Sequence, residues 1–341
     1  MHDPINRRKL EHLQILRDDP QTDRRKFYFD PIRLTHRALP EIDRDAVDTR
    51  VTFMGKTLSF PLLISGMTGG ADEALQTINR NLAIAAEATG IAMGLGSQRI
   101  MLADAQARAS FMLRDVAPQT LLFGNLGAIQ LNGGVTPADC TRLVDQTGVD
   151  ALCLHLNPLQ EAVQPEGDTN FSGLAARIAE VVRALKVPVV VKEVGTGISD
   201  EDAKRLIEAG VTTIDVAGAG GTSWSRIESH RDSTGCSSGE LFQDWGLPTP
   251  DALRLLQPYA DRLTLIASGG IRNGIDMVKA MILGASLCGV ARPFLDRAAE
   301  SPERMIDLIE TLRRQFTTAM FLLGQERVAD LINNRTLLLH P

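Results

Sequence analysis

The sequence predicts an α/β protein built as a (β/α)8 TIM barrel, with an N-terminal extension and an enlarged loop after the sixth strand. From about residue 58 onward, eight short apolar runs alternate with longer amphipathic stretches. Each run is apolar nearly throughout, as are parallel strands that are buried on both faces. Eight strand–helix units fit a barrel, whose typical size is about 250 residues plus insertions. A doubly wound sheet is the alternative, but it normally has fewer strands and one dominant nucleotide-binding motif.

The predicted elements follow one another in a regular order. The apolar runs are LSFPLLISG, AMGLGS, TLLFGNLG, ALCLHLN, VPVVVKEVG, TTIDVAG, RLTLIASGG and LCGVAR. The stretches between them carry apolar residues at helical spacing and usually end in glycine, which favours helix termination; examples are 74–90, 137–148, 170–186 and 201–210. We therefore expect residues 1–57 to form the extension, 58–341 the barrel and 219–249 the enlarged loop.

Composition excludes several classes of protein. The chain has 36 basic and 42 acidic residues, a net charge of −6, and only 4% aromatic residues, which argues against a nucleic-acid partner. No apolar stretch approaches the roughly 18 residues of a membrane span, and the first twenty residues are polar, so neither a membrane anchor nor a signal peptide is expected. The cysteines, Cys140, Cys153, Cys236 and Cys288, lack disulfide or zinc spacing, which indicates reduced thiols in a cytoplasmic protein.

Glycine and polar residues cluster at the predicted strand ends. All eight runs end in such residues while their interiors are apolar. The carboxyl ends of barrel strands carry the active site, so this one-sided pattern predicts a functional rim. Tight turns alone would explain several of the glycines but not Lys192 or the cluster from His155 to Glu161.

Lys192 directly follows the apolar run 187–191, so its stem begins at the rim of the barrel. An ammonium group there needs an anionic partner, because burying it unpaired is costly. Either Glu193 or a ligand can supply that partner. Since strand residues alternate sides, Lys192 and Glu193 cannot both point inward, which favours a ligand.

Two motifs predict a phosphate site. The segment Ser268-Gly269-Gly270-Ile271-Arg272 follows the seventh strand, and Ala291-Arg292 follows the eighth. Barrels commonly bind phosphate at this position, where glycines let backbone N–H groups approach the oxygens. We expect the phosphate of flavin mononucleotide (FMN) here.

The segment from His155 to Glu161 places an imidazole, two amides and a carboxylate at one strand end. Glu161 is a hard oxygen ligand of the kind that Mg²⁺ takes together with substrate phosphate oxygens. A solvated polar loop is the alternative. No spacing typical of zinc ligands is present.

The N-terminal extension carries a cluster of cations, Arg7, Arg8 and Lys9, followed by His12. On a helix, Arg8 or Lys9 would share a face with His12. Such a cluster can bind an anion, although a solvated charge run is the usual interpretation of such a segment.

Together these motifs resemble those of the type 2 isopentenyl-diphosphate isomerase family, the FMN-dependent isomerases. The resemblance covers nearly the whole chain. Its most specific parts are Gly66-Met67-Thr68-Gly69-Gly70, His155-x-Asn157-x-x-Gln160-Glu161 with 165–168, and the segments 191–195, 218–224 and 244–249. One departure is Ala217, which stands where relatives often have serine.

The resemblance implies a set of site residues. FMN would be held by Met67, Thr68, Gly69, Ser97, Asn125, Lys192, Thr222, Gly270, Arg272, Ala291 and Arg292. The diphosphate substrate would be bound by Arg8, Lys9, His12, Ser97, Arg99, His155, Asn157 and Gln160, with Mg²⁺ on Glu161. The residues implied to act in catalysis are Lys192, Gln160, Trp224 and His155.

The reaction implied by the resemblance is a 1,3-allylic proton shift between isopentenyl and dimethylallyl diphosphate, with reduced FMN as acid and base. NADPH would be the reductant, and relatives form homotetramers or larger assemblies such as octamers. The alternative function is an FMN-dependent oxidoreductase of the 2-hydroxyacid oxidase or inosinate-dehydrogenase type, for which Cys236 would be the candidate nucleophile. A non-catalytic flavin-binding protein would not need Glu161 or the basic arm.

Overall fold

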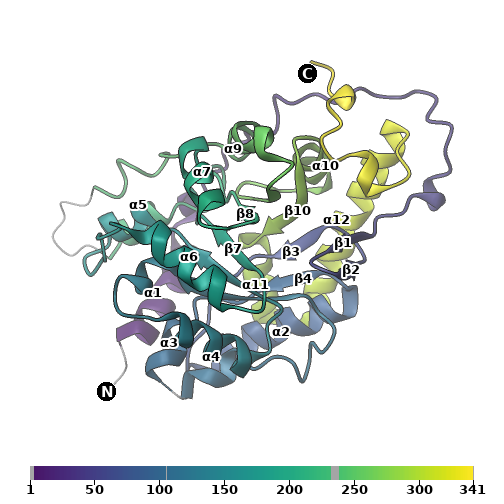
Figure 1. Ribbon diagram of the computed structural model, residues 1–341. Helices are drawn as coiled ribbons and strands as arrows, with labels where there is room; N and C mark the ends of the chain where they lie inside the picture. The colour runs from purple at the N-terminus through teal and green to yellow at the C-terminus, as the bar shows by residue number, and fades with distance from the viewer. Residues whose placement is uncertain (1–3, 105, 232–237, 341) are drawn as a thin grey trace.

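A closed barrel of eight parallel strands forms the centre of the computed structural model, which describes residues 4–104, 106–231 and 238–340 (Figure 1). The strands follow one another around the barrel in chain order, and the last closes onto the first. Each strand lies within one of the eight predicted apolar runs or overlaps it, so the predicted fold is confirmed. They are β3 (Leu62–Ile64), β4 (Ala92–Gly94), β5 (Leu122–Gly127), β6 (Ala151–His155), β7 (Val189–Lys192), β8 (Thr213–Asp215), β9 (Thr264–Ser268) and β10 (Ala285–Val290).

Helices surround the barrel, and their ends follow local sequence signals. Asp72 accepts a hydrogen bond from the backbone of Ala74 at the start of α2, and Gly90 ends that helix in the left-handed conformation. Thr136 forms a capping box with Asp139 at the start of α4. The helices are α2 (Glu73–Thr89), α3 (Arg99–Ala103), α4 (Pro137–Thr147), α6 (Leu174–Ala184), α7 (Asp200–Glu208), α9 (Thr249–Leu256), α10 (Gly274–Ile282), α11 (Arg292–Glu300) and α12 (Pro302–Leu323). Short 3-10 helices are η1 (Pro20–Thr22), η2 (Arg44–Ala46), η3 (Gln106–Ser110), η4 (Ala128–Leu131), η5 (Gln257–Tyr259), η6 (Val328–Asp330) and η7 (Arg335–Leu337).

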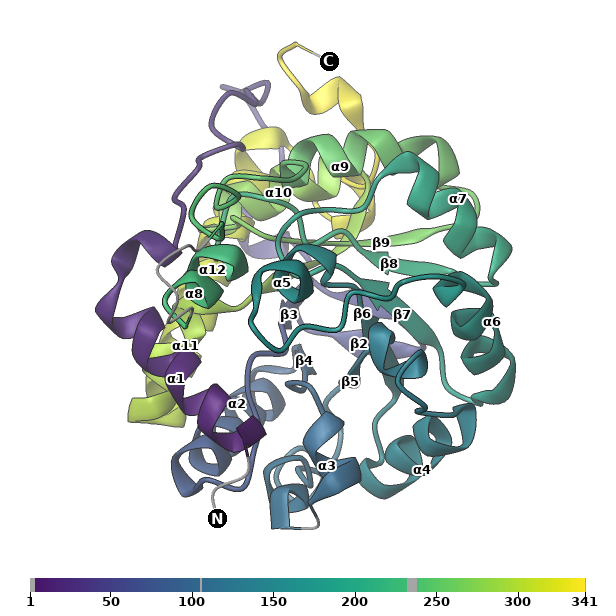
Figure 2. The same cartoon turned by 90° about the vertical axis from the view of Figure 1, so that its left-hand side faces the viewer.

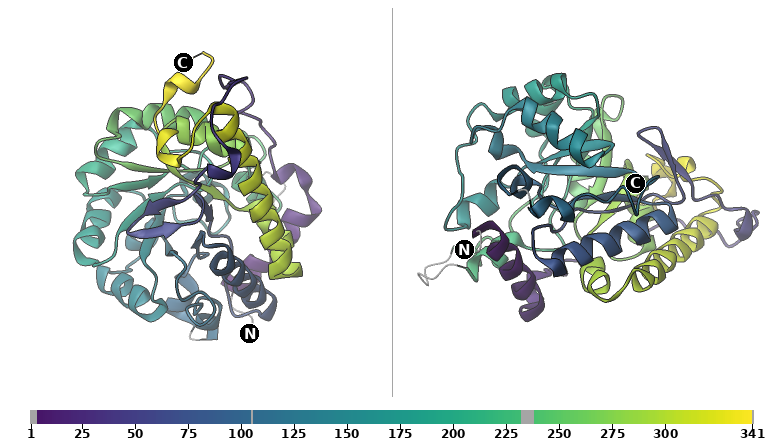
Figure 3. Two further views of the ribbon diagram at one scale, coloured as in Figure 1. Left: turned by 90° about the vertical axis from the view of Figure 1, so that its right-hand side faces the viewer. Right: turned by 90° about the horizontal axis from the view of Figure 1, so that it is seen from below.

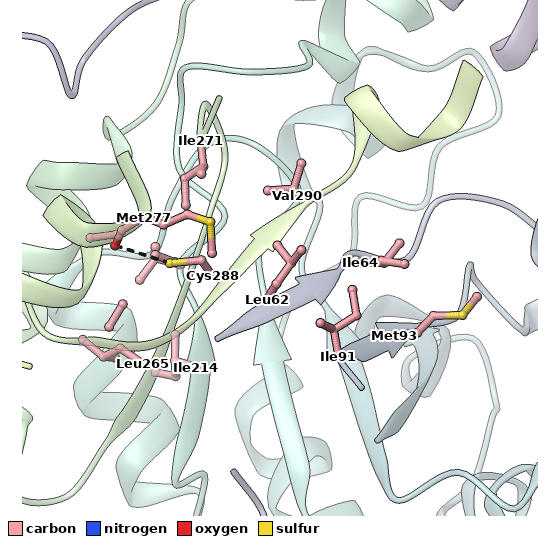
Figure 4. Packing of buried hydrophobic residues seen from close by; sticks show 14 of the residues in the cluster. Leu62, Ile64, Ile91, Met93, Ile214, Leu265, Ile271, Met277, Cys288 and Val290 are labelled. Atoms are coloured by element: carbon pink, nitrogen blue, oxygen red, sulfur yellow. Dashed lines mark hydrogen bonds between the residues drawn. The ribbon is translucent and has the colours of Figure 1, made fainter. Parts of the chain in front are cut away.

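The core has two parts because strand residues alternate between the two faces of the barrel wall. Leu62, Ile64, Met93 and Cys288 pack outward against the helices (Figure 4). A second cluster fills the inside of the barrel, and we call it the apolar layer. It contains Leu63, Ala92, Phe123, Cys153, Val190, Ile266 and Leu287.

A β-hairpin closes the amino-terminal end of the barrel (Figure 3, left). Its strands are β1 (Val51–Phe53) and β2 (Lys56–Leu58), which are antiparallel. Met54 and Gly55 both have positive φ, +47° and +78°, as a tight two-residue hairpin turn requires. Phe53 and Leu58 belong to the same cluster as the apolar layer. The sequence did not predict this hairpin, which spans the expected boundary at residue 57.

The N-terminal arm forms a helix, α1 (Pro4–Asp18), which meets the condition for Arg8 or Lys9 to share a face with His12. It lies beside α8 (Trp224–Ser229), a helix within the enlarged loop (Figure 2). Asp19, just after α1, accepts a hydrogen bond of 2.6 Å from Nε of Arg226 in α8. The enlarged loop therefore supports the arm.

Two further expectations concern membranes and thiols. Within the part of the chain that the structure describes, no helix is both long and apolar enough to cross a membrane. Cys140, Cys153 and Cys288 are buried free thiols. Cys236 lies outside the described residues.

Candidate active site

A cavity of about 450 Å³ opens at the carboxyl ends of the barrel strands. It brings together the residues predicted to bind FMN, the diphosphate or Mg²⁺ or to act in catalysis, with one exception. Gly69 is not in the lining; it packs against the ring of Phe111, which a Cβ at this position would approach to 2.3 Å. The lining includes Arg8, Lys9, His12, Met67, Thr68, Ser97, Arg99, Asn125, His155, Asn157, Gln160, Glu161, Lys192, Thr222, Trp224, Gly270, Arg272, Ala291 and Arg292.

The floor of the cavity is made by inward-facing residues two positions beyond the apolar layer on the same strands. We call this set the polar layer. It contains Ser65, Asn125, His155, Lys192 and Ser268, all of which line the cavity. Glycine replaces a side chain on β10, where a Cβ at Gly289 would lie 2.6 Å from Oγ of Ser65. Along each of these strands, the inward-facing side chain therefore changes from apolar to polar or to glycine within two residues.

Lys192 is not paired with the carboxylate of its neighbour Glu193. Its Nζ donates a hydrogen bond of 2.6 Å to the backbone carbonyl of Glu193. The Glu193 carboxylate instead accepts hydrogen bonds of 2.6 Å from the backbone N–H groups of Val194 and Gly195. The structure thus leaves the ammonium group facing the cavity, as the alternation argument predicted.

Asp215 is a buried acid that the sequence analysis did not single out. It lies directly opposite Lys192 in the β7–β8 register and is 1% exposed. Burial raises the pKa of its carboxyl, an effect that Lys192 and the hydroxyl of Ser268 oppose. Ser268 donates a hydrogen bond of 2.7 Å to it. The sequence does mark this residue, because Asp215 is the one charged residue in the predicted strand run 212–218.

Glycines allow the loops after β8 and β9 to approach each other closely. A Cβ at Gly269, whose φ is +96°, would lie 2.0 Å from the carbonyl oxygen of Gly218. A Cβ at Gly221 would lie 2.9 Å from the backbone nitrogen of Gly270. This part of the cavity is therefore lined by backbone rather than by side chains, as a closely approached phosphate or flat ring requires.

Two hydroxyl groups at the end of β3 lack partners. Oγ of Ser65 and Oγ1 of Thr68 are buried and have no hydrogen-bond partner among the described residues. Leaving a buried hydroxyl unpaired is costly, so both atoms indicate a polar group that occupies the cavity. Ser65 was not among the predicted site residues.

Ala217 also lines this part of the cavity. Its φ is +36°, in the region that favours glycine. Its backbone N–H donates a hydrogen bond of 3.2 Å to Asp215, which helps to hold this conformation.

The two arginines predicted to hold phosphate already have protein partners. Arg272 contacts Asp276 at 2.9 Å and Asp30 at 2.6 Å, and it lies over the ring of Phe27. Arg292 donates to the hydroxyl of Thr22 at 3.0 Å and to the carbonyl of Leu16. Both line the cavity, and both also fix the N-terminal segment to the barrel.

Glu161 lies in α5 (Pro158–Val163), which follows β6. The carboxylate is buried and accepts hydrogen bonds from Nδ2 of Asn157 at 2.9 Å, Nε2 of Gln164 at 2.6 Å and the backbone of Asp168 at 2.8 Å. Oδ1 of Asn157 is buried without a partner in the described part of the chain. The predicted cluster is thus an ordered group facing the cavity rather than a solvated loop.

A second buried acid, Glu228 in α8, connects α5 to the arm. It accepts hydrogen bonds from Nε2 of Gln160 at 2.8 Å and from Arg231 at 2.7 Å, and Nε2 of His12 lies 3.1 Å from it. Burial would raise the pKa of Glu228, but these partners lower it to about 2. No local sequence pattern marked this residue.

Two cations of the arm, Arg8 and Lys9, face the cavity. Burial, reinforced by Arg8, lowers the pKa of Lys9 to about 8. Nε of Arg8 is buried without a partner in the described part of the chain, although Nη1 lies 3.7 Å from Glu166. His12 is 5% exposed, and its ring meets that of Trp224 edge-on at 5.3 Å. The solvated charge run is therefore the wrong interpretation of these residues.

Ser97 and Arg99 contribute from the loop after β4 and the start of α3. The side chain of Arg99 is 39% exposed, and its Nη1 lies 4.0 Å from Asp168. A small positively charged region therefore surrounds one half of the cavity, and the glycine-lined backbone surrounds the other.

Comparison with known proteins first defines the class. A profile of the FMN-dependent dehydrogenase family matches residues 4–119 and 135–338. A flavocytochrome b2 with sulfite bound shares the fold, with a TM-score of 0.67 and 20% identity over 91% of this chain and 76% of that chain. A mandelate oxidase variant gives a TM-score of 0.61 and 20% identity over 90% of this chain and 88% of that chain.

Relatives of higher identity define the particular family. The isopentenyl-diphosphate delta-isomerase of Hydrogenovibrio crunogenus is 52% identical over 98% of both chains. That of Paracoccus zeaxanthinifaciens is 53% identical over 97% of this chain and 96% of its own. The chain belongs to the isopentenyl-diphosphate delta-isomerase family, as its motifs predicted.

Proposed function

We propose that this protein is an FMN- and Mg²⁺-dependent enzyme of isoprenoid biosynthesis that interconverts isopentenyl and dimethylallyl diphosphate. The observation that carries the proposal is the division of one cavity into two halves. A glycine-lined half with Lys192 and unpaired hydroxyls adjoins a half that is lined by Arg8, Lys9 and Arg99. The first half suits a flavin, and the second suits a diphosphate. The names of the relatives support the same reaction.

The residues present fit FMN. The buried hydroxyls of Ser65 and Thr68 lack partners that a polar ring edge would supply. Lys192 provides a cation on the cavity floor, which favours a flavin ring that carries negative charge. Reduced FMN, when bound, supplies the acid–base chemistry of the allylic proton shift. NADPH is the reductant that we propose.

The residues also fit one Mg²⁺ ion held jointly with the substrate. Within residues 4–104, 106–231 and 238–340, no group of three or more His, Cys, Asp or Glu side chains could hold a metal by itself. Among the described residues that line the cavity, Glu161 is the one buried carboxylate. Mg²⁺ typically takes one or two carboxylates plus phosphate oxygens and water, so a diphosphate would complete its coordination.

The other residues orient the substrate and exclude water. Arg8, Lys9 and Arg99 attract the diphosphate, and binding energy at this end positions the alkene. The rings of Trp224 and His12 pack edge-on at the side of the cavity and limit access of water. Gln160 presents a carboxamide held by Glu228 and Asn157, which can hydrogen-bond the substrate.

The test is an assay of the purified protein with FMN, NADPH and Mg²⁺. We expect dimethylallyl diphosphate to form from isopentenyl diphosphate, with a large loss of turnover in Lys192→Ala. Lys204→Ala is the matched control, because Lys204 is an exposed lysine paired with Asp200 on α7. A folded, flavin-loaded protein that makes no product but oxidises a 2-hydroxy acid would favour the oxidoreductase alternative. We also propose a homo-oligomer, a tetramer or octamer, in the cytoplasm; sedimentation and fractionation test these points.

A further inference from the structure

His155 is held in a defined orientation by Asn125. The two residues lie on neighbouring strands, β6 and β5, and Nδ1 of His155 is 2.8 Å from Oδ1 of Asn125. The amide of Asn125 is fixed in turn, because its Nδ2 donates a hydrogen bond of 2.9 Å to the carbonyl of Leu95. Oδ1 can therefore only accept, so Nδ1 of His155 carries the proton of this hydrogen bond.

Among the described residues, the charged groups that shift the pKa of His155 are cations. Lys192 lies opposite it in the β6–β7 register, and Lys9 and Arg8 approach from α1. Burial, reinforced by these three cations, lowers the pKa of His155 to about 3. The ring is thus neutral at neutral pH. A neutral ring with its proton on Nδ1 has a lone pair on Nε2.

Nε2 is next to the part of the cavity that is lined by cations. A Cβ at Gly127 would lie 3.1 Å from Nε2, so the glycine keeps this nitrogen uncovered. His155, Arg8 and Lys9 line the same cavity. Phosphate oxygens are acceptors, as is the Nε2 lone pair, so the two repel each other unless a proton lies between them.

We propose that binding of a diphosphate here is coupled to the uptake of one proton by Nε2 of His155. This inference rests on the proposed function, which makes a diphosphate the substrate. The proton comes from solvent and bonds to Nε2, and the resulting imidazolium donates to a phosphate oxygen and to Asn125. The negative charge of the ligand stabilises the imidazolium against Lys192, Lys9 and Arg8. Asn125 is a positioning residue, because it determines which nitrogen is free.

The number of protons taken up can be measured by titration calorimetry in buffers with different ionisation enthalpies. The oxidised holoenzyme with Mg²⁺ is titrated with isopentenyl diphosphate between pH 5.5 and 7.5. His155→Gln is the matched variant, because a neutral amide can donate to phosphate without taking up a proton. Ionisation of the ligand itself contributes equally to both. At about pH 6 we expect the wild-type protein to take up close to one proton more than His155→Gln.

Equal proton numbers in the two proteins throughout this range would overturn the inference while leaving the substrate assignment intact. Absence of binding to the folded wild-type holoenzyme would count against the proposed function instead. Asn125→Asp gives a further test, because a carboxylate at Nδ1 favours the imidazolium before ligand binds. We expect its proton uptake to be smaller, and an uptake equal to that of the wild type would overturn the positioning role of Asn125.

Nitrogen NMR of the ligand-free holoenzyme tests the starting state without any variant needing to fold. We expect one histidine to show a protonated Nδ1 and an unprotonated Nε2 at pH 6, and to become doubly protonated when isopentenyl diphosphate is added. If Nε2 of His155 carries a proton before the ligand is added, the inference is overturned.

Discussion

The two ends of the barrel are built from the same strands and differ in function. At the amino-terminal end, the apolar layer is covered by the hairpin residues Phe53 and Leu58. Two positions further along the strands, the polar layer forms the floor of the cavity. Residues at both levels are largely buried, as the 0% exposure of Phe123 and the 7% exposure of Asn125 show. Burial alone therefore does not separate residues that stabilise the fold from those that bind a ligand; chemical type and strand end do.

The largest expected effect is a loss of stability. It comes from a substitution at the amino-terminal end of the barrel, which the hairpin covers and which we call the closed end; the end with the cavity is the open end. The ring of Phe123 packs edge-on against Phe53 with centroids 6.4 Å apart. Phe123→Ala should lower the free energy of unfolding by about 3–5 kcal/mol, because it leaves a cavity that the barrel cannot refill. Urea denaturation measures this loss. KM should stay within about twofold, and Phe123→Leu should cost less; a large change in KM with little loss of stability would contradict the division between the two ends.

At the open end, we expect Glu161→Gln to reduce activity strongly and to change stability little. The substitution keeps the shape of the side chain but removes the anionic oxygen that Mg²⁺ prefers, so turnover should fall by about a hundredfold. The Mg²⁺ concentration needed for half-maximal activity should rise, while the unfolding transition shifts little. An unchanged Mg²⁺ dependence would mean that the metal is held elsewhere.

Lys9, at the open end, should make KM depend on pH. Its pKa of about 8 in the free enzyme lies below the usual value, so the ammonium loses its proton as the pH rises through 8. Binding of the diphosphate favours the charged form, so KM should rise above pH 8, by up to about tenfold per pH unit for a single group. Lys9→Arg should keep KM low to pH 9, and Lys9→Met should make it high and insensitive to pH. A KM of the wild-type protein that is constant from pH 7 to 9 would exclude this role.

The smallest expected effect concerns backbone strain at the open end. Ala217 has a φ of +36°, which costs a residue with a Cβ about 1–2 kcal/mol, partly offset in Ala217→Gly by the greater freedom of the unfolded chain. We expect Ala217→Gly to raise the free energy of unfolding by about 0.5–1 kcal/mol. Ala217→Ser should leave it unchanged, since serine has the same strain. A loss of stability in the glycine variant would show that the conformation is not strained.

Much of the fold could be predicted because its signals are local. Apolar runs marked the strands, and Gly90 and Gly148 marked the ends of α2 and α4. The hairpin was missed because its strands have only three residues each and its turn is Met-Gly rather than Asn-Gly. Such short strands show no clear alternation.

The site was predicted as a set of residues, but not their pairings. Lys192 ends β7 and Glu161 lies shortly after β6, so both could be singled out by their position beside an apolar run. The contacts of Arg272 with Asp30 and of Arg292 with Thr22 join segments more than two hundred residues apart, which no local pattern reveals. Glu228 lies in a loop whose path depends on the arm. Tertiary contacts between distant segments therefore complete the site.

The hairpin also affects how the barrel folds. Phe53 and Leu58 come before all eight barrel strands in the chain, yet they share a cluster with Leu287, which is in the last strand. Closing this end therefore joins segments separated by almost the whole barrel, and such contacts carry a high entropic cost until the intervening chain is ordered. The hairpin should dock late, after most of the barrel has assembled. The contacts of Phe53 and Leu58 then form after the transition state for folding. A substitution that weakens them should therefore speed unfolding more than it slows refolding.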